Sequence, residues 1–162
     1  MQTLRTAVFA GSFDPITLGH LEIINRGLEL FDKIIIGVGI NSRKQHLFPI
    51  EQRLSWIQSE FKQVERVEVA AFDQLTVDFA RKHGAKFLLR GLRNFSDLEY
   101  ETHISRINQF LNHEIETVFL VCNPGNSHIS STFVREIYRY KGKLEGLVPP
   151  AVVKDLYGDQ PI

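Results

Sequence analysis

The segment from residue 11 to residue 20 contains the side chains best suited to chemistry on a phosphate. It reads Gly-Ser-Phe-Asp-Pro-Ile-Thr-Leu-Gly-His. Gly11 lets a ligand approach the main chain, Ser12 adds a hydroxyl, and the Asp-Pro pair favours a turn. Exposed amides at a helix start bind phosphate, and His20 can donate a hydrogen bond to a phosphoryl oxygen as its charge develops. Each residue alone also fits an ordinary strand-to-helix turn, so the prediction depends on their combination.

Two arginines that flank a glycine form a second candidate phosphate site, in the run Arg90-Gly91-Leu92-Arg93. Two guanidinium groups can clamp a phosphate bidentately while the glycine admits it to the main chain. A surface ion pair is the alternative for either arginine, but Arg90 continues an apolar strand and needs a strong anionic partner. Downstream, Ser96-x-x-Glu99 fits a capping box that would begin the next helix.

Three further loops contain polar residues. The loop of residues 41–48 contains Lys44, a mobile cation that can follow a phosphate, and its neighbour Arg43 leaves that assignment open. The loop of residues 123–129 leads into Ser130-Ser131-Thr132, whose hydroxyls and helix-start amides suit an anion, although one hydroxyl would serve only as the N-cap. The segment 72–76 has no strong signature, because Thr76 fits a helix start as well as a ligand contact.

The remaining histidines do not have the spacing of metal ligands: they are His46, His83, His103, His113 and His128. Two of them, His46 and His128, lie in loops where they could touch a ligand, but surface or packing roles are the more ordinary interpretation for all five. No cluster of carboxylates is apparent either. A metal ion would therefore be held mostly by phosphates and water.

Five apolar runs, at residues 4–10, 33–40, 66–70, 86–90 and 116–122, have the composition of buried strands. Between them apolar residues recur at helical spacing, as in Leu21, Ile24, Leu28 and Phe31. This alternation predicts an α/β fold that is Rossmann-like and doubly wound, with a five-stranded, mainly parallel sheet covered by helices on both faces. Ligands bind at the carboxyl ends of the strands in such sheets, where the polar loops lie.

The chain has 162 residues, and its 19 lysines and arginines balance its 19 aspartates and glutamates. That length predicts a single domain over residues 1–162, with a frayed tail at about 158–162. The balanced charge gives no basic field for nucleic acid, and no apolar run has membrane-spanning length, so neither partner is expected. The single Cys122 excludes an intrachain disulfide and fits a buried hydrophobe, and a reducing cytoplasm is the expected location.

Together these motifs resemble those of the nucleotidyltransferase superfamily, whose members transfer a nucleoside monophosphate from a nucleoside triphosphate and release pyrophosphate. The Gly-Ser-Phe-Asp-Pro run followed by Gly-His carries this resemblance. Thr17, where many relatives have histidine, and Arg-Gly-Leu-Arg with the later Tyr100-Glu101 are similar to the phosphopantetheine adenylyltransferase branch. Ser12 replaces the usual threonine of that branch and keeps its hydroxyl. The implied reaction is AMP transfer from ATP to 4′-phosphopantetheine, giving dephospho-coenzyme A and pyrophosphate in coenzyme A biosynthesis.

The resemblance also implies roles for individual residues. His20 would stabilise the transition state and form the catalytic set with Lys44 and Arg90. Phosphopantetheine would contact Ser12, Lys44, Thr76 and Arg90. ATP would contact Ser12, Phe13, His20, Gly91, Leu92, Arg93, Glu101, Asn126, Ser127, His128, Ile129, Ser130, Ser131 and Thr132. Mg²⁺ would be held mainly by the ATP phosphates and water, with no protein ligand.

Two other functions stay open on the sequence. Nicotinate-nucleotide adenylyltransferases share the first loop, but they usually have histidine in place of Thr17 and lack Arg-Gly-Leu-Arg. A non-catalytic nucleotide sensor would have the same fold, although the presence of His20, Lys44 and both arginines argues against it. The resemblance further implies a homohexamer and feedback binding of coenzyme A.

Overall fold

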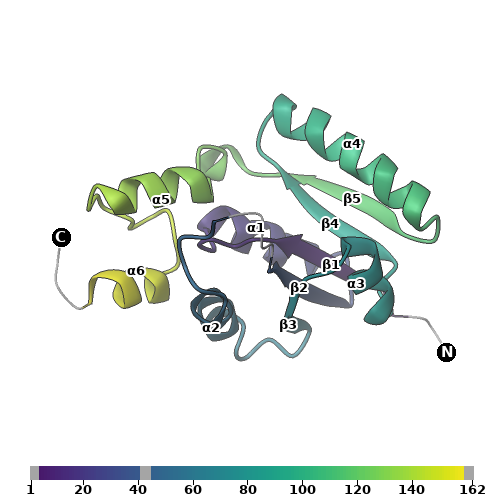
Figure 1. Cartoon of the computed structure of the whole chain (residues 1–162), viewed down its shortest axis with the longest axis horizontal. Helices are drawn as coiled ribbons and strands as arrows, with labels where there is room; N and C mark the ends of the chain where they lie inside the picture. The colour runs from purple at the N-terminus through teal and green to yellow at the C-terminus, as the bar shows by residue number, and fades with distance from the viewer. Residues whose placement is uncertain (1–3, 41–44, 159–162) are drawn as a thin grey trace.

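The structure is a computed structural model, and it describes residues 4–40 and 45–158. Its elements follow one another as β1 (Thr6–Gly11), α1 (Leu18–Gly27), β2 (Lys33–Gly39), α2 (Ile50–Glu60), β3 (Val67–Phe72), α3 (Thr76–Lys82), β4 (Phe87–Leu92), α4 (Phe95–Leu111), β5 (Glu116–Val121), η1 (Pro124–Asn126), α5 (Ser131–Arg139) and α6 (Pro150–Tyr157). The five strands form one sheet in the order β3-β2-β1-β4-β5, and all its pairs are parallel (Figure 1).

Helices cover both faces of the sheet, as the sequence predicts. Successive side chains of β1 point to opposite faces because strands have a period of two. Ala7 lies in the core on one face together with Ile24 of α1. Val8 lies in the core on the other face together with Phe79 of α3. The Rossmann-like, doubly wound α/β fold is therefore confirmed, and it comprises one α/β domain.

The strand order reverses beside β1. The chain passes from β1 outwards to β2 and β3, and then returns to place β4 on the opposite side of β1. Ala7 pairs with Ile34 on one side and with Phe87 on the other. In open parallel sheets a crevice forms at such a reversal, at the carboxyl ends of the two strands. The segments after β1 and β4 are the two with the strongest phosphate-binding signatures.

The strand β4 extends further than its apolar run predicts. Pairing with β5 continues beyond Arg90 through Gly91 and Leu92, so these two residues lie in the strand and not in a loop. A Cβ atom at Gly91 would lie 2.8 Å from a side-chain carbon of Ile23. The glycine is therefore needed for the close packing of α1 on this strand end.

Two helix boundaries also differ from expectation. The Asn94 side chain caps α4 by accepting a 2.9 Å hydrogen bond from the Asp97 amide, so the helix begins at Phe95 and the predicted Ser96 capping box is wrong. An asparagine carbonyl is as good an N-cap acceptor as a serine hydroxyl. At the other boundary, α1 ends at Gly27, and the buried Phe31 of the predicted period lies beyond the turn that follows the helix.

The helices α5 and α6 lie next to each other at one end of the molecule, beyond the sheet (Figure 1). The indole Nε1 of Trp56 on α2 donates a 2.8 Å hydrogen bond to Asp155 of α6. Val152 of α6 is fully buried in the same core as α1 and α2. The last helix is thus part of the domain. In the described part of the chain, no helix has the length and apolar character that crossing a membrane requires.

Candidate functional site

Two adjoining cavities open at the carboxyl ends of β1 and β4. The first, of about 650 Å³, is lined by His20, Arg93 and the start of α5, and we call it the His20 cavity. The second, of about 760 Å³, extends to Thr76 on α3, and we call it the Thr76 cavity. Residues that line both are Ala10, Gly11, Ser12, His46, Arg90, Tyr100 and Glu101. Two ligands, one in each cavity, would therefore meet at the ends of these strands.

His20 lies in the first turn of α1, which has Thr17 as its N-cap. The Thr17 amide donates a 3.0 Å hydrogen bond to Nδ1 of His20, and the Thr17 hydroxyl lies 3.0 Å from the same nitrogen. The hydroxyl oxygen accepts a 3.4 Å hydrogen bond from the His20 amide. Because an amide N–H can only donate, Nδ1 is an acceptor, and the proton of the neutral ring lies on Nε2.

The surroundings of His20 favour this neutral ring. Burial lowers its pKa from 6.5 to about 4, and the charges of Arg90 and Arg93 add to the shift. Both effects penalise the imidazolium form. The Phe13 ring meets the imidazole edge-on at 5.0 Å and supports it from the side. At neutral pH, His20 therefore offers the Nε2–H group as an uncharged donor in the cavity.

This arrangement makes a prediction for titration of the free protein. We expect the His20 ring to stay neutral as the pH falls from about 8 to about 5, because its folded-state pKa lies well below that of an ordinary histidine. Nitrogen NMR of histidine-labelled protein should show a proton on Nε2 and none on Nδ1 across this range. The His20→Gln variant identifies the signal. A His20 signal that titrates near pH 6.5 would contradict this description.

Phe13 has an unusual backbone conformation for a bulky residue. Its φ of 46° lies in the left-handed region, and its side chain is 2% exposed. Strain of this kind costs of order 1–3 kcal/mol and persists only where the surroundings impose it. Here the conformation places the ring between Phe9 and His20. The Phe13 side chain therefore supports His20, and only part of the residue faces the cavity.

The amides at the start of α1 are less available to a phosphate than the sequence predicts. Leu18 donates to the carbonyl of Leu147 at 3.0 Å, and Leu21 donates to the carbonyl of Thr17 at 3.1 Å. His20 donates to the Thr17 hydroxyl, as described above. An anion in this cavity would therefore depend mainly on side chains such as His20, and less on the helix N-terminus.

Arg90 already has a carboxylate partner. Its Nε and Nη2 donate to the two carboxylate oxygens of Glu101 at 2.7 and 2.6 Å, and its Nη1 donates to the carbonyl of Ala10. Glu101 is 8% exposed on α4. A guanidinium has five N–H groups, so one on each Nη is left after these contacts. The bidentate pair fixes the plane of the guanidinium where the two cavities meet.

Arg93 is held in the same manner, three residues further along. Its Nε and Nη2 donate to Asp97 at 2.9 and 3.0 Å. Burial opposes the charge on Asp97, but the hydrogen bonds from Arg93 outweigh it and keep the pKa of Asp97 below its usual value. Both arginines are thus oriented by carboxylates of α4.

The wall of the His20 cavity opposite Arg93 is attached to α1 by Glu22. Its carboxylate accepts from the Asn126 side chain at 2.7 Å, from the Asn123 amide at 2.9 Å and from Arg26 at 2.9 Å. Burial alone would raise the pKa of Glu22, but these hydrogen bonds outweigh it and hold the pKa below the ordinary value. Glu22 therefore positions the loop after β5.

We expect Glu22→Gln to lower the free energy of unfolding at pH 7 by about 1–2 kcal/mol, since hydrogen bonds to a charged group are lost. A depressed pKa stabilises the folded state above the unfolded-state pKa, and this contribution disappears as the pH falls through the folded-state value. The difference from wild type should therefore shrink at acidic pH, as measured by urea unfolding. The exposed Glu29, replaced by glutamine, is the matched control in the turn that follows α1. A pH-independent difference would contradict the assignment.

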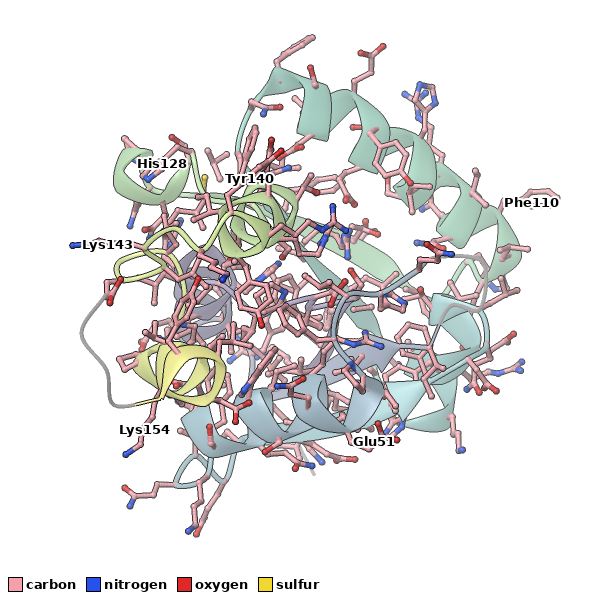
Figure 2. The ribbon with its side chains drawn as sticks, turned by 60° about the vertical axis from the view of Figure 1, so that its left-hand side comes forward. Glu51, Phe110, His128, Tyr140, Lys143 and Lys154 are labelled. Atoms are coloured by element: carbon pink, nitrogen blue, oxygen red, sulfur yellow. The ribbon has the colours of Figure 1, made fainter. Side chains whose placement is uncertain are left out.

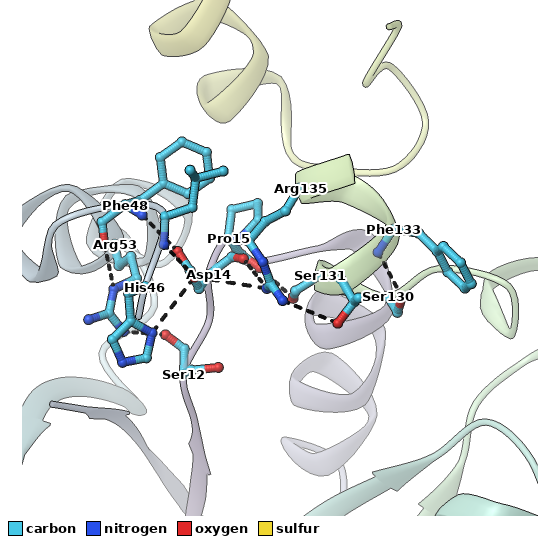
Figure 3. A network of polar contacts seen from close by, with 12 residues as sticks. Ser12, Asp14, Pro15, His46, Phe48, Arg53, Ser130, Ser131, Phe133 and Arg135 are labelled. Atoms are coloured by element: carbon cyan, nitrogen blue, oxygen red, sulfur yellow. Dashed lines mark hydrogen bonds and ion pairs between the residues drawn. The ribbon is translucent and has the colours of Figure 1, made fainter. Parts of the chain in front are cut away.

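The three hydroxyls at the start of α5 have partners within the protein. Ser130 is the N-cap and accepts from the Phe133 amide at 3.2 Å. Ser131 donates to the carbonyl of Pro15 at 2.8 Å, and Thr132 accepts from Arg135 at 3.2 Å (Figure 3). The first of these agrees with the expectation that one hydroxyl is a cap. The second attaches α5 to the turn after β1.

The structure brings most of the predicted site residues together. Those that line the His20 cavity are Ser12, Phe13, His20, Arg90, Gly91, Arg93, Glu101, Asn126, Ile129, Ser130, Ser131 and Thr132. Ser12 and Arg90 also line the Thr76 cavity, where Thr76 lies. Leu92, Ser127 and His128 do not line either cavity: Leu92 is buried, the Ser127 hydroxyl donates to the carbonyl of Pro124, and the exposed His128 lines a separate cavity with Tyr140 (Figure 2). Lys44 and Arg43 lie outside the described residues.

Sequence reasoning missed one buried cation. Arg53 of α2 is 2% exposed and donates to the carbonyls of Ser12 at 2.6 Å, Phe48 at 3.1 Å and Gly39 at 3.2 Å. Burial lowers its pKa from the usual arginine value. It thereby holds the turn after β1 against the end of β2. An arginine one residue before Leu54, on the apolar side of a predicted helix, was the available signal.

Cys122 is buried beside the His20 cavity, and burial raises the pKa of its thiol, so it remains a neutral hydrophobe as predicted. Within residues 4–40 and 45–158, no group of three or more histidine, cysteine or acidic side chains is arranged to hold a metal ion.

A family model and two relatives of similar sequence indicate the family of this chain. A sequence model described as cytidylyltransferase-like matches residues 8–137. The phosphopantetheine adenylyltransferase of Geotalea daltonii is 48% identical over 153 residues, which are 94% of this chain and 95% of the relative. That of Flavobacterium johnsoniae is 48% identical over 149 residues, which are 92% of this chain and 97% of the relative.

A solved structure gives the same fold at much lower identity. The crystal structure of a proposed nicotinate-nucleotide adenylyltransferase from Vibrio parahaemolyticus covers 98% of both chains with a TM-score of 0.71 and 14% identity. At that identity the similarity shows the fold alone, because one fold supports many acceptors. The relatives at 48% identity are the informative ones for substrate choice.

Proposed function

The chain belongs to the phosphopantetheine adenylyltransferase family, and from that premise we propose that ATP occupies the His20 cavity and 4′-phosphopantetheine the Thr76 cavity. As a member of this family it transfers AMP from ATP to 4′-phosphopantetheine, in the biosynthesis of coenzyme A. The observation that carries the site assignment is the wall shared by the two cavities. Ser12 and Arg90 lie in that wall, where the reacting phosphates of two such ligands would meet.

The reaction itself makes modest chemical demands on the protein. A phosphate oxygen of phosphopantetheine forms a bond to the α-phosphorus of ATP, and the bond from that phosphorus to the oxygen of the β-phosphate breaks. Pyrophosphate leaves with the electron pair. The attacking phosphate is already ionised, so the site needs no general base. Catalysis then depends on aligning two anions and on stabilising the charge that develops between them.

His20 is suited to that stabilisation. Its Nε2–H group can donate to an oxygen of the α-phosphate as that oxygen gains charge in the transition state. A neutral N–H group can stabilise this charge by a hydrogen bond without transferring its proton to the substrate. Thr17 fixes the orientation of the His20 ring before the substrate binds. We therefore assign His20 the main role in transition-state stabilisation.

The cations would offset repulsion between the substrates. Arg90 retains two N–H groups at the shared wall, and these suit the phosphate of phosphopantetheine. Ser12 would add its hydroxyl there, and Lys44 is proposed for the same phosphate on the family resemblance. Thr76 would contact the pantetheine arm. Glu101 would act through Arg90, because its carboxylate is already occupied by that guanidinium.

On the nucleotide side, we propose that Gly91, Arg93 and residues 126–132 surround ATP. Arg93, oriented by Asp97, supplies charge for the triphosphate. The loop held by Glu22 and the start of α5 form the opposite wall. Leu92, Ser127 and His128 could reach the nucleotide only if these segments moved, and Leu92 is better suited to packing.

Members of this family are expected to need a divalent metal ion, and we propose Mg²⁺. The Mg²⁺ ion would neutralise part of the negative charge of the triphosphate, and it would be held mainly by phosphates and water. The described residues fit this arrangement, because the acidic side chains in the His20 cavity, Asp14, Asp97 and Glu101, already have arginine or main-chain partners.

We also propose a homohexamer, in keeping with the family resemblance. Large apolar side chains of α4 and β5 are exposed, including Phe95, Phe110 and Val121, at 79%, 89% and 65%. Phe110 projects away from the rest of the chain (Figure 2). Exposed apolar surface of this kind favours contact between subunits. Coenzyme A contains both an adenylate and a pantetheine part, so feedback binding across the two cavities is a further proposal. The cytoplasmic location stays a prediction.

The direct test is release of pyrophosphate from ATP with each of two acceptors. With 4′-phosphopantetheine we expect release together with formation of dephospho-coenzyme A. With nicotinate mononucleotide we expect no release above the rate without acceptor. Release with nicotinate mononucleotide but not with 4′-phosphopantetheine would indicate nicotinate-nucleotide adenylyltransferase activity. Release with neither acceptor would contradict the proposed function and favour a non-catalytic nucleotide sensor.

A further inference from the structure

The carboxylate of Asp14 is a buried point of attachment in the turn after β1. Asp14 is 2% exposed. Its Oδ2 accepts from the Leu47 amide and its Oδ1 from the Phe48 amide, both at 2.9 Å. Nδ1 of His46 lies 3.7 Å from Oδ2. The amides of the loop that brings His46 to the wall of both cavities are therefore held by this carboxylate.

On its other side, Asp14 contacts α5. Nη1 of Arg135 donates to the carbonyl of Asp14 at 2.7 Å and lies 3.9 Å from the carboxylate oxygen Oδ2. The hydroxyl of Ser131 donates to the next carbonyl, that of Pro15, at 2.8 Å. Both Ser131 and Arg135 line the His20 cavity. Figure 3 shows Asp14 between His46 and Phe48 on one side and Arg135 on the other.

The loop side of this arrangement depends on the carboxylate. The α5 side depends on the carbonyls of Asp14 and Pro15, with the carboxylate of Asp14 3.9 Å from Arg135. An asparagine keeps the size, but its NH₂ group would face the N–H of Leu47 or Phe48, and one buried amide would lose its acceptor. Arg135 would lose its nearby negative charge at the same time. If either the loop of residues 45–48 or α5 moved, Asp14 would move with it and shift the other, because closely packed contacts move together.

We propose that Asp14 is a positioning residue that couples ligand binding in the Thr76 cavity to ligand binding in the His20 cavity. It would do so by joining the loop of residues 45–48 to the start of α5, so that ordering one of them by its ligand orders the other. This inference rests on the proposed function, since the ligands concerned are the two substrates. Coupling of this kind is reciprocal: each ligand changes the affinity of the other by the same factor.

The test measures that factor by titration calorimetry. We would measure the dissociation constant of 4′-phosphopantetheine with and without a saturating ATP analogue whose α,β-bridge is methylene, and the reverse pair. We expect the coupling factor of Asp14→Asn to be lower than that of wild type by at least about fivefold, within the usual range of such couplings. Repulsion between the two anions is common to both proteins and cancels in this comparison.

Two further variants keep the test decisive. Arg135→Met breaks only the α5 side and leaves the amides of Leu47 and Phe48 with their acceptor, so it should also lose coupling even if Asp14→Asn fails to fold. Asp97→Asn is the matched control: Asp97 pairs with an arginine of the His20 cavity and does not line the Thr76 cavity. It should weaken binding of the ATP analogue and retain the wild-type coupling factor.

Each outcome distinguishes the inference from the proposed function. Failure of the wild type to bind 4′-phosphopantetheine would overturn the proposed function itself. Binding of both ligands with no coupling in wild type, or with equal coupling in wild type and both variants, would overturn only the role of Asp14. A loss of thermal stability with unchanged coupling would show that Asp14 is merely structural.

Discussion

Replacing His20 by alanine is expected to lower kcat by about 10²- to 10³-fold, while KM for ATP changes by less than about threefold. The reason is the timing of the interaction. In the proposed mechanism, the Nε2–H group would meet an oxygen whose charge grows only as the phosphorus is attacked, so its hydrogen bond would strengthen in the transition state. Steady-state kinetics with both substrates saturating measure the two constants.

Glutamine at position 20 is the informative control. Its side-chain NH₂ can occupy nearly the place of Nε2, so His20→Gln should recover part of the loss in kcat. A rise in KM for ATP as large as the fall in kcat would contradict the assignment, because it would mean that His20 holds the ground state. Full recovery by glutamine would agree with a neutral donor, the form that the lowered pKa of His20 indicates.

Replacing Arg90 by methionine is expected to have two separable effects. The kcat/KM for 4′-phosphopantetheine should fall about 10²-fold, which corresponds to the loss of about 3 kcal/mol of charge-assisted hydrogen bonding. The free energy of unfolding should also fall by about 3 kcal/mol, because Glu101 becomes a buried carboxylate without its partner. Urea unfolding and steady-state kinetics measure the two effects on the same preparation.

The double variant Arg90→Met with Glu101→Gln separates them. Removing the second charge should restore much of the stability, since an uncompensated buried charge is the main penalty. Activity should stay low, because no cation faces the acceptor phosphate. Recovery of activity in the double variant would contradict the role of Arg90 as a substrate contact. It would instead show that Arg90 serves only to neutralise Glu101.

The sequence predicted which loops form the site because that information is local. A strand is followed by a turn, a glycine, a histidine and a helix within residues 11–20, and parallel sheets bring such loops to one edge. The Rossmann-like fold follows from apolar runs alternating with helical periods. Even the need of Arg90 for an anionic partner was apparent from its place in a buried strand.

The identity of the partners was not predictable in this way. Glu101, which pairs with Arg90, was expected to contact ATP, and Glu22, which is 104 residues from Asn126, was not singled out. The pair of Glu22 and Asn126 depends on the strand order β3-β2-β1-β4-β5 and on the packing of α1 against β4. The pair of Arg90 and Glu101 depends on how α4 packs back against β4. A single sequence does not specify such long-range contacts, so it indicates candidate cations and not the carboxylates that orient them.

The tautomer of His20 illustrates the same limit at short range. The sequence places threonine three residues before histidine, and in the structure this threonine is the N-cap of α1. It does not show that the amide of Thr17 donates to Nδ1, which depends on the rotamer imposed by Phe13 and Phe9. The protonation form of the His20 ring therefore could not be predicted without the packed structure.

A crystal structure of the protein with dephospho-coenzyme A bound would test most directly whether the transfer takes place where the two cavities meet. We predict that the adenylate lies in the His20 cavity, the pantetheine arm extends towards Thr76, and the diphosphate joining them lies beside Ser12, His20 and Arg90. A product whose adenylate and pantetheine parts both lie in one cavity, with the diphosphate away from these three residues, would contradict this account.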